Sequence, residues 1–363
     1  MHVLNLSWKL VLCLLLPYGL LAQDNEALNR TNKIIKKASI PALSLAQLNG
    51  NDTPNTIAIG HKNAKEKNPI DPNTIFSAAS LSKPVVAYIT LQLVHQNKFD
   101  LDRPLVKYFN YEDVAADPRH QQVTARHILS HTSGLPNWRP RGKALTFRQD
   151  PGLSFKYSGE GFVWLSKVLV SLTGKKFETL AQEMVFQPLG MERTSYVWRD
   201  SLETNYALPH DKYAKPRRKY FPTQPNAAAS LQTTANDYAL FLKALLDGKF
   251  ISKSLQTEMF SPQVSIENYE KQGQKISWGL GVGIQEKADG LEFWHWGDNG
   301  TFKAYFTVSP STQKGLVYFA NSSNGLSITQ GITDLYLGTA QPAVMWNDYP
   351  QLGLWYHLMK IFK

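Results

Sequence analysis

Cysteine is almost absent from this sequence, since Cys13 is the single one among 363 residues. It lies in the apolar run LVLCLLL, which follows Lys9 and precedes PYGLLAQ. This order is typical of a secretory signal peptide over residues 1–22, cleaved near Ala22, and the run is too short to span a bilayer. We therefore expect an exported chain, periplasmic or secreted, whose mature form has no thiol, which excludes disulfides and cysteine-bound metals.

Internal repeats and low-complexity segments are also missing. A hydrophobic content of 43% and an aromatic content of 12% exclude a disordered or fibrous chain and suffice for a large buried core. Because the leader carries one lysine and no acid, its loss lowers the net charge from +10 to about +9. This charge favours either binding to an anionic cell-envelope polymer or solubility alone.

Nucleic acid is not an expected partner, because the basic residues are scattered along the chain. The one dense cluster, KPRRKY at residues 215–220, lies in a loop bounded by prolines. We expect a monomer that acts on a small-molecule or peptide acyl substrate.

The order of predicted elements indicates an α+β fold. Short strands come first, a mostly helical stretch follows over residues 80–274, and strands return near the C-terminus. The predicted architecture is an antiparallel sheet built from both chain ends and flanked by helices, with the helical region inserted between them. Its parts are a domain over residues 23–340, with the sheet drawn from 34–79 and 275–340, and a C-terminal extension over 341–363. The aromatic tail of that extension either packs on the domain or forms an interfacial helix.

Two residues of the stretch FSAASLSKPV are candidates for catalysis. Ser80 and Lys83 lie three apart, so on a helix the hydroxyl and the amine share one face. Pro84 places the helix start, because its ring would clash with the carbonyl of Ser80 inside a helix. Ser80 is therefore expected at or just before a helix N-terminus, where free N–H groups stabilise an oxyanion. Ser311 and Lys314 repeat the spacing, but in a turn between two strands.

The chain resembles the serine β-lactamases and penicillin-binding proteins, and within them the class C β-lactamase-related group. The resemblance covers about residues 34–337 and rests on blocks in the order of that group: SLSK, LDLDRPLVKYF, ARHILSHTSGLP, PGLSFKYSGEGF, PLGMERTSY, AAASLQTTANDYALFLKALLDG and HWGDNGTFKAYF. It implies the β-lactamase/D,D-peptidase fold, with Ser80 as nucleophile and Lys83 as base. Lys83 needs a lowered pKa for this role, which burial can supply.

The second motif of the family is a tyrosine, any residue and an asparagine, the tyrosine acting with the lysine as general acid and base. Tyr108 begins the literal match, but it precedes LSHTSGLP, whereas the family's tyrosine follows that block. The order assigns the role to Tyr157 and leaves Tyr108 a structural residue. Gly159 then stands in place of the asparagine, which puts β-lactam and peptide recognition in doubt.

The third motif is lysine or histidine, any residue and glycine on an edge strand. The resemblance assigns it to His295, Trp296 and Gly297, with the N–H of Asp298 as the second oxyanion donor beside that of Ser80. The lysine version at residues 271–273, KQG, lies in a hydrophilic stretch without strand character. A histidine is mostly neutral at pH 7 and attracts a carboxylate less than lysine does, so His295 and Trp296 favour an uncharged or aromatic acyl substrate.

We expect no cofactor and no metal. His127 and His131 have a helical metal-ligand spacing, but Ile128 stands where a zinc protease needs glutamate, and LSHTSGLP is a structural turn in the family. The predicted function is an exported serine hydrolase that cleaves an ester or amide through a Ser80 acyl-enzyme, as an esterase, a D,D-peptidase or D-aminopeptidase, or a weak β-lactamase. The alternative is a penicillin-recognising or envelope-binding module with little or no turnover.

Overall fold

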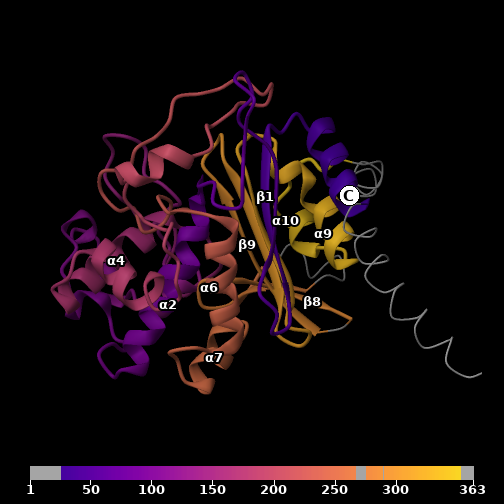
Figure 1. Ribbon diagram of the computed structural model, residues 1–363. Helices are drawn as coiled ribbons and strands as arrows, with labels where there is room; N and C mark the ends of the chain where they lie inside the picture. The colour runs from indigo at the N-terminus through magenta and orange to yellow at the C-terminus, as the bar shows by residue number, and fades with distance from the viewer. Residues whose placement is uncertain (1–25, 267–274, 289, 353–363) are drawn as a thin grey trace, which may run out of the picture.

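An antiparallel sheet of nine strands forms the centre of the computed structural model, which describes residues 26–266, 275–288 and 290–352 (Figure 1). The strand order is β3-β2-β1-β11-β10-β9-β8-β7-β6. The predicted sheet, built from both chain ends and flanked by helices, is confirmed. The strands are β1 (Ala42–Asn49), β2 (Asn55–Asn63), β3 (Asn68–Pro69), β6 (Val264–Ser265), β7 (Ile276–Trp278), β8 (Gly283–Lys287), β9 (Gly290–Asp298), β10 (Lys303–Ser309) and β11 (Lys314–Ala320).

The two chain ends meet where β1 pairs with β11, in a register that sets Leu43 opposite Ala320 and Asn49 opposite Lys314. β10, the next strand, is buried along its whole length. Helices cover both faces of the sheet, so these strands read as nearly continuous apolar runs instead of an apolar and polar alternation. A further short pair joins β4 (Phe76–Ser77) to β5 (Gln232–Thr233), and β4 precedes the segment that carries Ser80.

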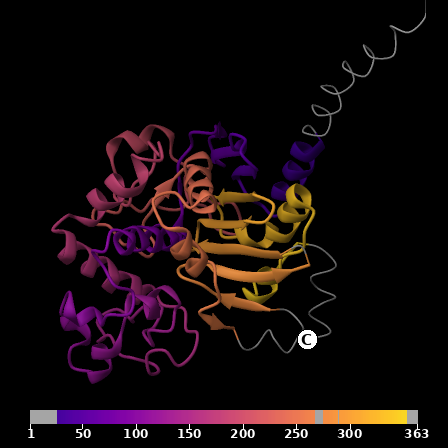
Figure 2. The ribbon, with the colours of Figure 1, turned by 90° about the horizontal axis from the view of Figure 1, so that it is seen from below.

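Two helical layers enclose the sheet. α2, α4, α6 and α7 lie on one side, whereas α9 and α10 lie on the other, beside the helical residues 26–37 (Figures 1 and 2). Each layer has its own buried apolar cluster against the sheet. The α-helices are α2 (Ser82–His95), α3 (Ala125–Leu129), α4 (Gly159–Thr173), α5 (Phe177–Ala181), α6 (Ala235–Asp247), α7 (Lys253–Met259), α9 (Thr329–Leu337) and α10 (Pro342–Trp346).

Glycines end three of these helices. Gly174 follows α4 with a φ of 67°, Gly248 follows α6 with a φ of 65°, and Gly338 follows α9 with a φ of 65°, a left-handed conformation that glycine adopts without steric cost. Within the described ranges, no helix combines the length and apolarity needed to cross a membrane. The predicted leader over residues 1–22 and the KQG stretch at 271–273 lie outside the described residues.

Candidate active site

Ser80 lies in a single 3₁₀ turn, η1 (Ala79–Leu81), which leads directly into α2. Pro84 consequently falls in the first turn of α2, where a helix has no internal N–H bond to lose. Ala79 has a φ of 50°, a strained backbone for a residue with a Cβ atom. The segment is therefore held in an unusual conformation immediately before the serine.

Three side-chain hydroxyls hold this segment in place. The Tyr196 hydroxyl donates to the carbonyl of Ser82 at 2.7 Å, and the Tyr238 hydroxyl donates to the carbonyl of Leu81 at 2.9 Å. The hydroxyl of Ser82 accepts from the N–H of Leu231 at 3.1 Å and donates to the carbonyl of Ala79 at 2.6 Å. All are buried, so these bonds are shielded from competing water.

Lys83 has a fully buried side chain whose amine points at Ser80. Its Nζ donates to the Ser80 Oγ at 2.9 Å and to the carbonyl of Ala228 at 2.9 Å. No carboxylate contributes to its pKa, and desolvation lowers that pKa from 10.5 to about 7. A large share of the amine is therefore neutral near pH 7 and can accept the proton of the serine.

Tyr157 brings a phenol to the same place. Its ring centroid lies 4.8 Å from the Lys83 Nζ and 4.7 Å from the ring of Trp296. The phenol oxygen is buried and has no hydrogen bond of ordinary geometry among the described residues. Burial raises its pKa well above the usual value, although the nearby Ser80 hydroxyl lowers it to a smaller extent. The structure therefore brings Ser80, Lys83 and Tyr157 together.

Tyr108, the residue of the literal motif, has a different environment. Its hydroxyl accepts from the N–H of Asp100 at 3.1 Å, and its ring packs against Phe99 with centroids 4.7 Å apart. These are local contacts of the loop that follows α2. Such contacts are those of a structural residue, which is the role that the order of the motifs predicts for Tyr108.

Gly159, where the family has asparagine, is the first residue of α4. A Cβ atom there would lie 2.8 Å from the backbone oxygen of Asn137 and 2.8 Å from the indole of Trp138. The Gly159 N–H donates to the backbone oxygen of Asn137 at 3.0 Å and to its side-chain oxygen at 3.1 Å. Trp138, whose ring centre lies 6.0 Å from the Lys83 Nζ, therefore occupies space beside the missing asparagine side chain.

The third motif lies on the last residues of β9. The strand pairs with β8 as far as Trp294, and from His295 to Asp298 its described partner is β10 alone. Among the described residues β9 is thus paired on both sides at Phe293 and Trp294 and has a free edge from His295 to Asp298. β9 is an inner strand of the sheet and not the predicted edge strand, but Gly297 lies on its free half.

Gly297 lies against the segment that carries the serine. A Cβ atom on it would lie 2.4 Å from the carbonyl oxygen of Ala78 and 3.2 Å from the Cβ of Ala79. Any side chain would push β9 away from Ser80, so the close approach of the two backbones requires glycine.

His295 is fully buried and uncharged. Its Nδ1 lies 2.7 Å from the carbonyl oxygen of Trp296, so Nδ1 carries the proton and donates it there. Desolvation lowers its pKa to about 3, with a further decrease from Lys83. The Nε2 atom is then a bare acceptor, and it has no partner among the described residues. His295 is therefore neutral not only at pH 7, as the sequence predicts, but at any pH well above 3.

His131 belongs to the same cluster, which the sequence did not indicate because LSHTSGLP read as a structural turn. Its ring packs against that of Tyr157 with centroids 4.2 Å apart, and its Nδ1 accepts from the N–H of Ser158 at 3.0 Å. Desolvation, followed by Lys83 and His295, lowers its pKa well below the usual value. The ring is consequently neutral with its proton on Nε2, and it supports Tyr157 from one side.

The metal pair considered for His127 and His131 is not formed. The Nδ1 of His127 accepts from the N–H of Thr124 at 3.3 Å and caps α3, whereas the Nδ1 of His131 faces Ser158. Over the described ranges no three His, Cys, Asp or Glu side chains gather in a way that could hold a metal ion.

Asp298 follows Gly297 and has a firmly held carboxylate. It forms an ion pair with Lys303, accepts from the N–H of Gly300 at 2.7 Å and from the hydroxyl of Tyr349 at 2.6 Å. Burial raises the pKa of this carboxyl, but these partners together bring it below the usual value. The carboxylate is therefore charged, and its side chain is fixed from three directions.

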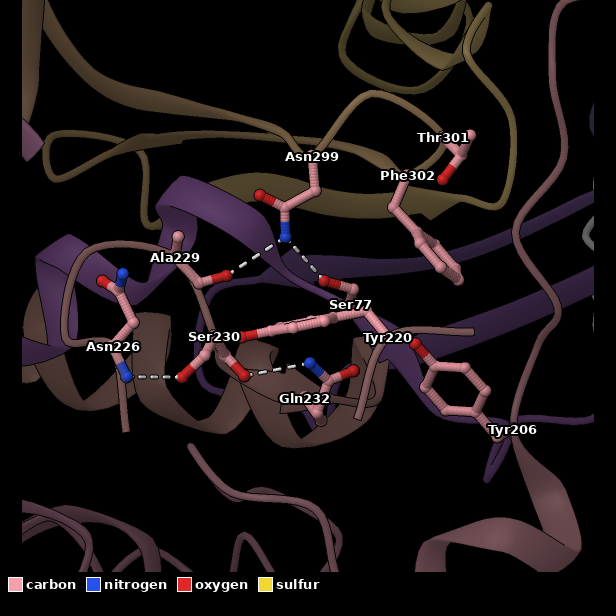
Figure 3. Close-up of a pocket in the computed structure, with 10 residues that line it drawn as sticks. All are labelled: Ser77, Tyr206, Tyr220, Asn226, Ala229, Ser230, Gln232, Asn299, Thr301 and Phe302. Atoms are coloured by element: carbon pink, nitrogen blue, oxygen red, sulfur yellow. Dashed lines mark hydrogen bonds between the residues drawn. The ribbon is translucent and has the colours of Figure 1, made fainter. Parts of the chain in front are cut away.

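A cavity of about 220 Å³ adjoins the segments that carry these groups (Figure 3). Ser77, Ala229 and Asn299 line it, and they neighbour Ser80, Ala228 and Asp298 in the sequence. The amide of Asn299 crosses one wall, donating to the Ser77 hydroxyl at 3.0 Å and to the carbonyl of Ala229 at 3.1 Å.

The chemistry of the cavity is uncharged throughout. Its remaining lining residues are Tyr206, Tyr220, Asn226, Ser230, Gln232, Thr301 and Phe302. The amide of Gln232 donates to the carbonyl of Ser230 at 2.9 Å, and none of the residues that line the cavity is charged. The cavity is therefore suited to an uncharged group.

The close approach at Gly297 yields a test of the packing. Gly297→Ala is expected to lower the free energy of unfolding by about 1–3 kcal/mol, because its Cβ would overlap a backbone oxygen that cannot rotate away. Denaturant unfolding monitored by tryptophan fluorescence measures the change. Gly331→Ala is the matched control, since a Cβ there would meet Ile34 at an ordinary 3.6 Å. Equal stability of the two variants would contradict the close approach.

Comparisons with known proteins identify relatives of this chain. The family model described as Beta-lactamase matches residues 27–340. Penicillin-binding protein 4* of Bacillus subtilis is 26% identical over 320 residues, which cover 76% of this chain and 67% of that protein. Esterase EstB of Burkholderia gladioli is 28% identical over 180 residues, which cover 41% of this chain and 45% of the esterase.

Solved structures have the same fold. The D-alanine carboxypeptidase AmpC of Burkholderia cenocepacia superimposes with a TM-score of 0.73 at 17% identity, over 87% of this chain and 99% of the other. The match of the family model over most of the chain confirms the resemblance drawn from the motifs. The chain therefore belongs to the beta-lactamase family, within the superfamily of serine β-lactamases and penicillin-binding proteins.

Proposed function

We propose that this chain is an exported serine hydrolase that cleaves an ester or amide through an acyl-enzyme on Ser80. The observation that carries the proposal is the buried amine of Lys83, 2.9 Å from the Ser80 Oγ, with a pKa lowered to about 7. A serine hydroxyl is a weak nucleophile on its own, and an adjacent neutral amine can take its proton as the bond to the substrate forms. Export rests on the predicted leader.

In the first half of the reaction, Lys83 accepts the hydroxyl proton while the Ser80 oxygen attacks the substrate carbonyl carbon. The carbonyl oxygen becomes an oxyanion, which the family resemblance assigns to the N–H groups of Ser80 and Asp298. The start of α2, directly after Ser80, adds the positive end of the helix dipole.

Collapse of the tetrahedral intermediate requires a proton for the leaving group. Tyr157 is suited to give it, because burial raises the pKa of its phenol and keeps it protonated. Tyr157 then recovers a proton from the Lys83 ammonium, and the acyl group stays on Ser80. Water then attacks the ester so formed. Its proton passes through the same two groups to the Ser80 oxygen, and the acid is released.

An uncharged substrate suits the site best. His295, where many family members have lysine, is neutral and offers no charge to a substrate carboxylate. The adjoining cavity has no charged side chain, and Trp138 and Trp296 present aromatic surfaces close to Lys83 and Tyr157. These features support an aryl or alkyl ester, or a peptide whose acyl part is neutral, over a penicillin with its carboxylate.

The alternative is a penicillin-recognising or envelope-binding module with little or no turnover. Gly159 supports it, because the space beside the missing asparagine is taken by Trp138 and Asn137. The basic cluster at residues 215–220 gives it less support, since Arg217 pairs with Asp211 and Lys219 with Glu203. The intact pair of Ser80 and Lys83 favours the hydrolase.

Ser80→Ala separates the two functions. The substitution is expected to lower the turnover of p-nitrophenyl esters by at least about three orders of magnitude, because no other group supplies the nucleophile. Ser311→Ala is the matched control, since Ser311 has the same spacing to a lysine but lies in the turn between β10 and β11. D-Ala-D-Ala peptides and a fluorescent penicillin are tested beside the esters, and the substrate that is turned over names the activity. Ligand binding without turnover, equal in the wild type and in Ser80→Ala, would contradict the hydrolase.

The pH dependence of turnover tests the part of Lys83. kcat/KM is expected to rise with pH through an apparent pKa of about 7 and to level off above it, because the neutral amine is the active form. The pH profile of ester hydrolysis measures this limb. His295→Gln is expected to keep the limb, since the pKa of His295 lies at about 3. Loss of the limb in that variant, or a limb near pH 10, would count against Lys83 as the base.

A further inference from the structure

The C-terminal extension packs against the site, although it begins where the family match ends at residue 340. α10 places the ring of Trp346 5.4 Å from that of Trp296 and 5.5 Å from that of Trp294, measured between centroids. Phe155 lies 5.8 Å away on the loop before Tyr157. The described part of the extension therefore covers residues that the site uses and is not a separate tail.

Tyr349, also in the extension, contacts Asp298, the residue that follows Gly297. Its hydroxyl donates to the Oδ2 of Asp298 at 2.6 Å, and the Nζ of Lys303 lies 5.5 Å from its ring centre. Lys303 itself pairs with the Oδ1 of Asp298. Carboxylate, ammonium and phenol thus form one closed group at the end of β9.

The phenol of Tyr349 acts as a donor over the whole neutral range. Burial, followed by Asp298, raises its pKa above the usual value. Tyr349 is therefore protonated, and able to donate, while it is bonded to Asp298.

We propose that residues 341–352 complete this active site, with Tyr349 as a positioning residue for Asp298 and Trp346 as a support for Trp296. The inference rests on the proposed function, in which the backbone N–H of Asp298 stabilises the oxyanion. After Trp294, β10 is the only strand that pairs with β9 among the described residues, so no strand on the other side holds the Asp298 backbone. Fixing the Asp298 carboxylate from two sides, with Lys303 and Tyr349, therefore limits how far the backbone beside it can turn.

Lys303 and Tyr349 hold the Asp298 carboxylate in different ways. An ammonium holds a carboxylate as a point charge without a preferred direction, whereas a phenol O–H at 2.6 Å sets the angle of the carboxylate plane. The two oxygens of Asp298 are thus held separately, one by Lys303 and the Gly300 N–H, the other by Tyr349.

A double-mutant cycle tests the inference. Tyr349→Phe keeps the ring and its contact with Lys303 but removes the hydroxyl, and it is expected to lower kcat for ester hydrolysis about tenfold, the effect of one lost hydrogen bond to a charged group. KM is expected to stay within about twofold, because the oxyanion exists in the transition state and not in the bound substrate. In the Asp298→Ala background the same change is expected to cost less than about twofold, since the phenol then has no side-chain oxygen to hold.

Tyr336→Phe is the matched control. It removes a hydroxyl that also lies near the C-terminus, but one that bonds to Thr31 in the N-terminal helical stretch and not to a site residue. Its kcat is expected to equal that of the wild type. An unchanged kcat in Tyr349→Phe, or an equal loss in both Asp298 backgrounds, would overturn the inference.

Labelling of Ser80 by a fluorophosphonate probe distinguishes failure of this inference from failure of the proposed function. A wild-type chain that is labelled but turns over none of the esters, the D-Ala-D-Ala peptides or the penicillin contradicts the hydrolase, and the labelling rate of Tyr349→Phe then decides the part of Tyr349. Labelling that is about tenfold slower supports the positioning role, because attack on phosphorus builds negative charge on an oxygen as ester hydrolysis does, and the same N–H groups would stabilise it. An equal labelling rate overturns it, and a wild type that is neither labelled nor active on any of these substrates overturns both proposals.

Discussion

The burial of one amine is the constraint on which this site depends. Lys83 has no carboxylate partner among the described residues, and its fully buried amine is hydrogen-bonded to the Ser80 hydroxyl and the Ala228 carbonyl. A buried ammonium without a counter-charge is costly, and the protein lowers that cost by lowering the pKa of the group. The packing of α2 between α4 and the sheet thus produces a base at neutral pH as a consequence of the fold.

The sheet brings β9 against residues 78–80, the segment that carries the serine. β9 is held by β8 over its first half and by β10 along its second half, and the glycine at position 297 permits contact with Ala78 and Ala79. The strained backbone at Ala79 belongs to the same contact, because a relaxed turn would move Ser80. Helix start and strand end are therefore fixed relative to each other by backbone atoms, which move less than side chains.

The sequence predicted the parts of this site that follow local rules. The spacing of Ser80 and Lys83, together with Pro84, located the helix start, and the order of the motifs selected Tyr157 over Tyr108. The strands near the C-terminus could be predicted because their sequences are rich in apolar residues. Trp138, His131 and Tyr349 were not predicted as site residues, since each comes from a segment whose local pattern reads as a loop or a tail. Their contacts join residues far apart in the chain, and no spacing rule describes such contacts.

The two histidines decide which chemistry the site can support. His131 and His295 are both neutral, because each is buried near Lys83 and a second positive charge would repel the first. A site with a lysine in place of His295 would hold two cations around Tyr157 and would lower the pKa of the phenol, as opposite charges do. With neutral rings on both sides the phenol stays protonated. This agrees with the proposed division of roles, in which the amine of Lys83 is the base at neutral pH and Tyr157 is the acid.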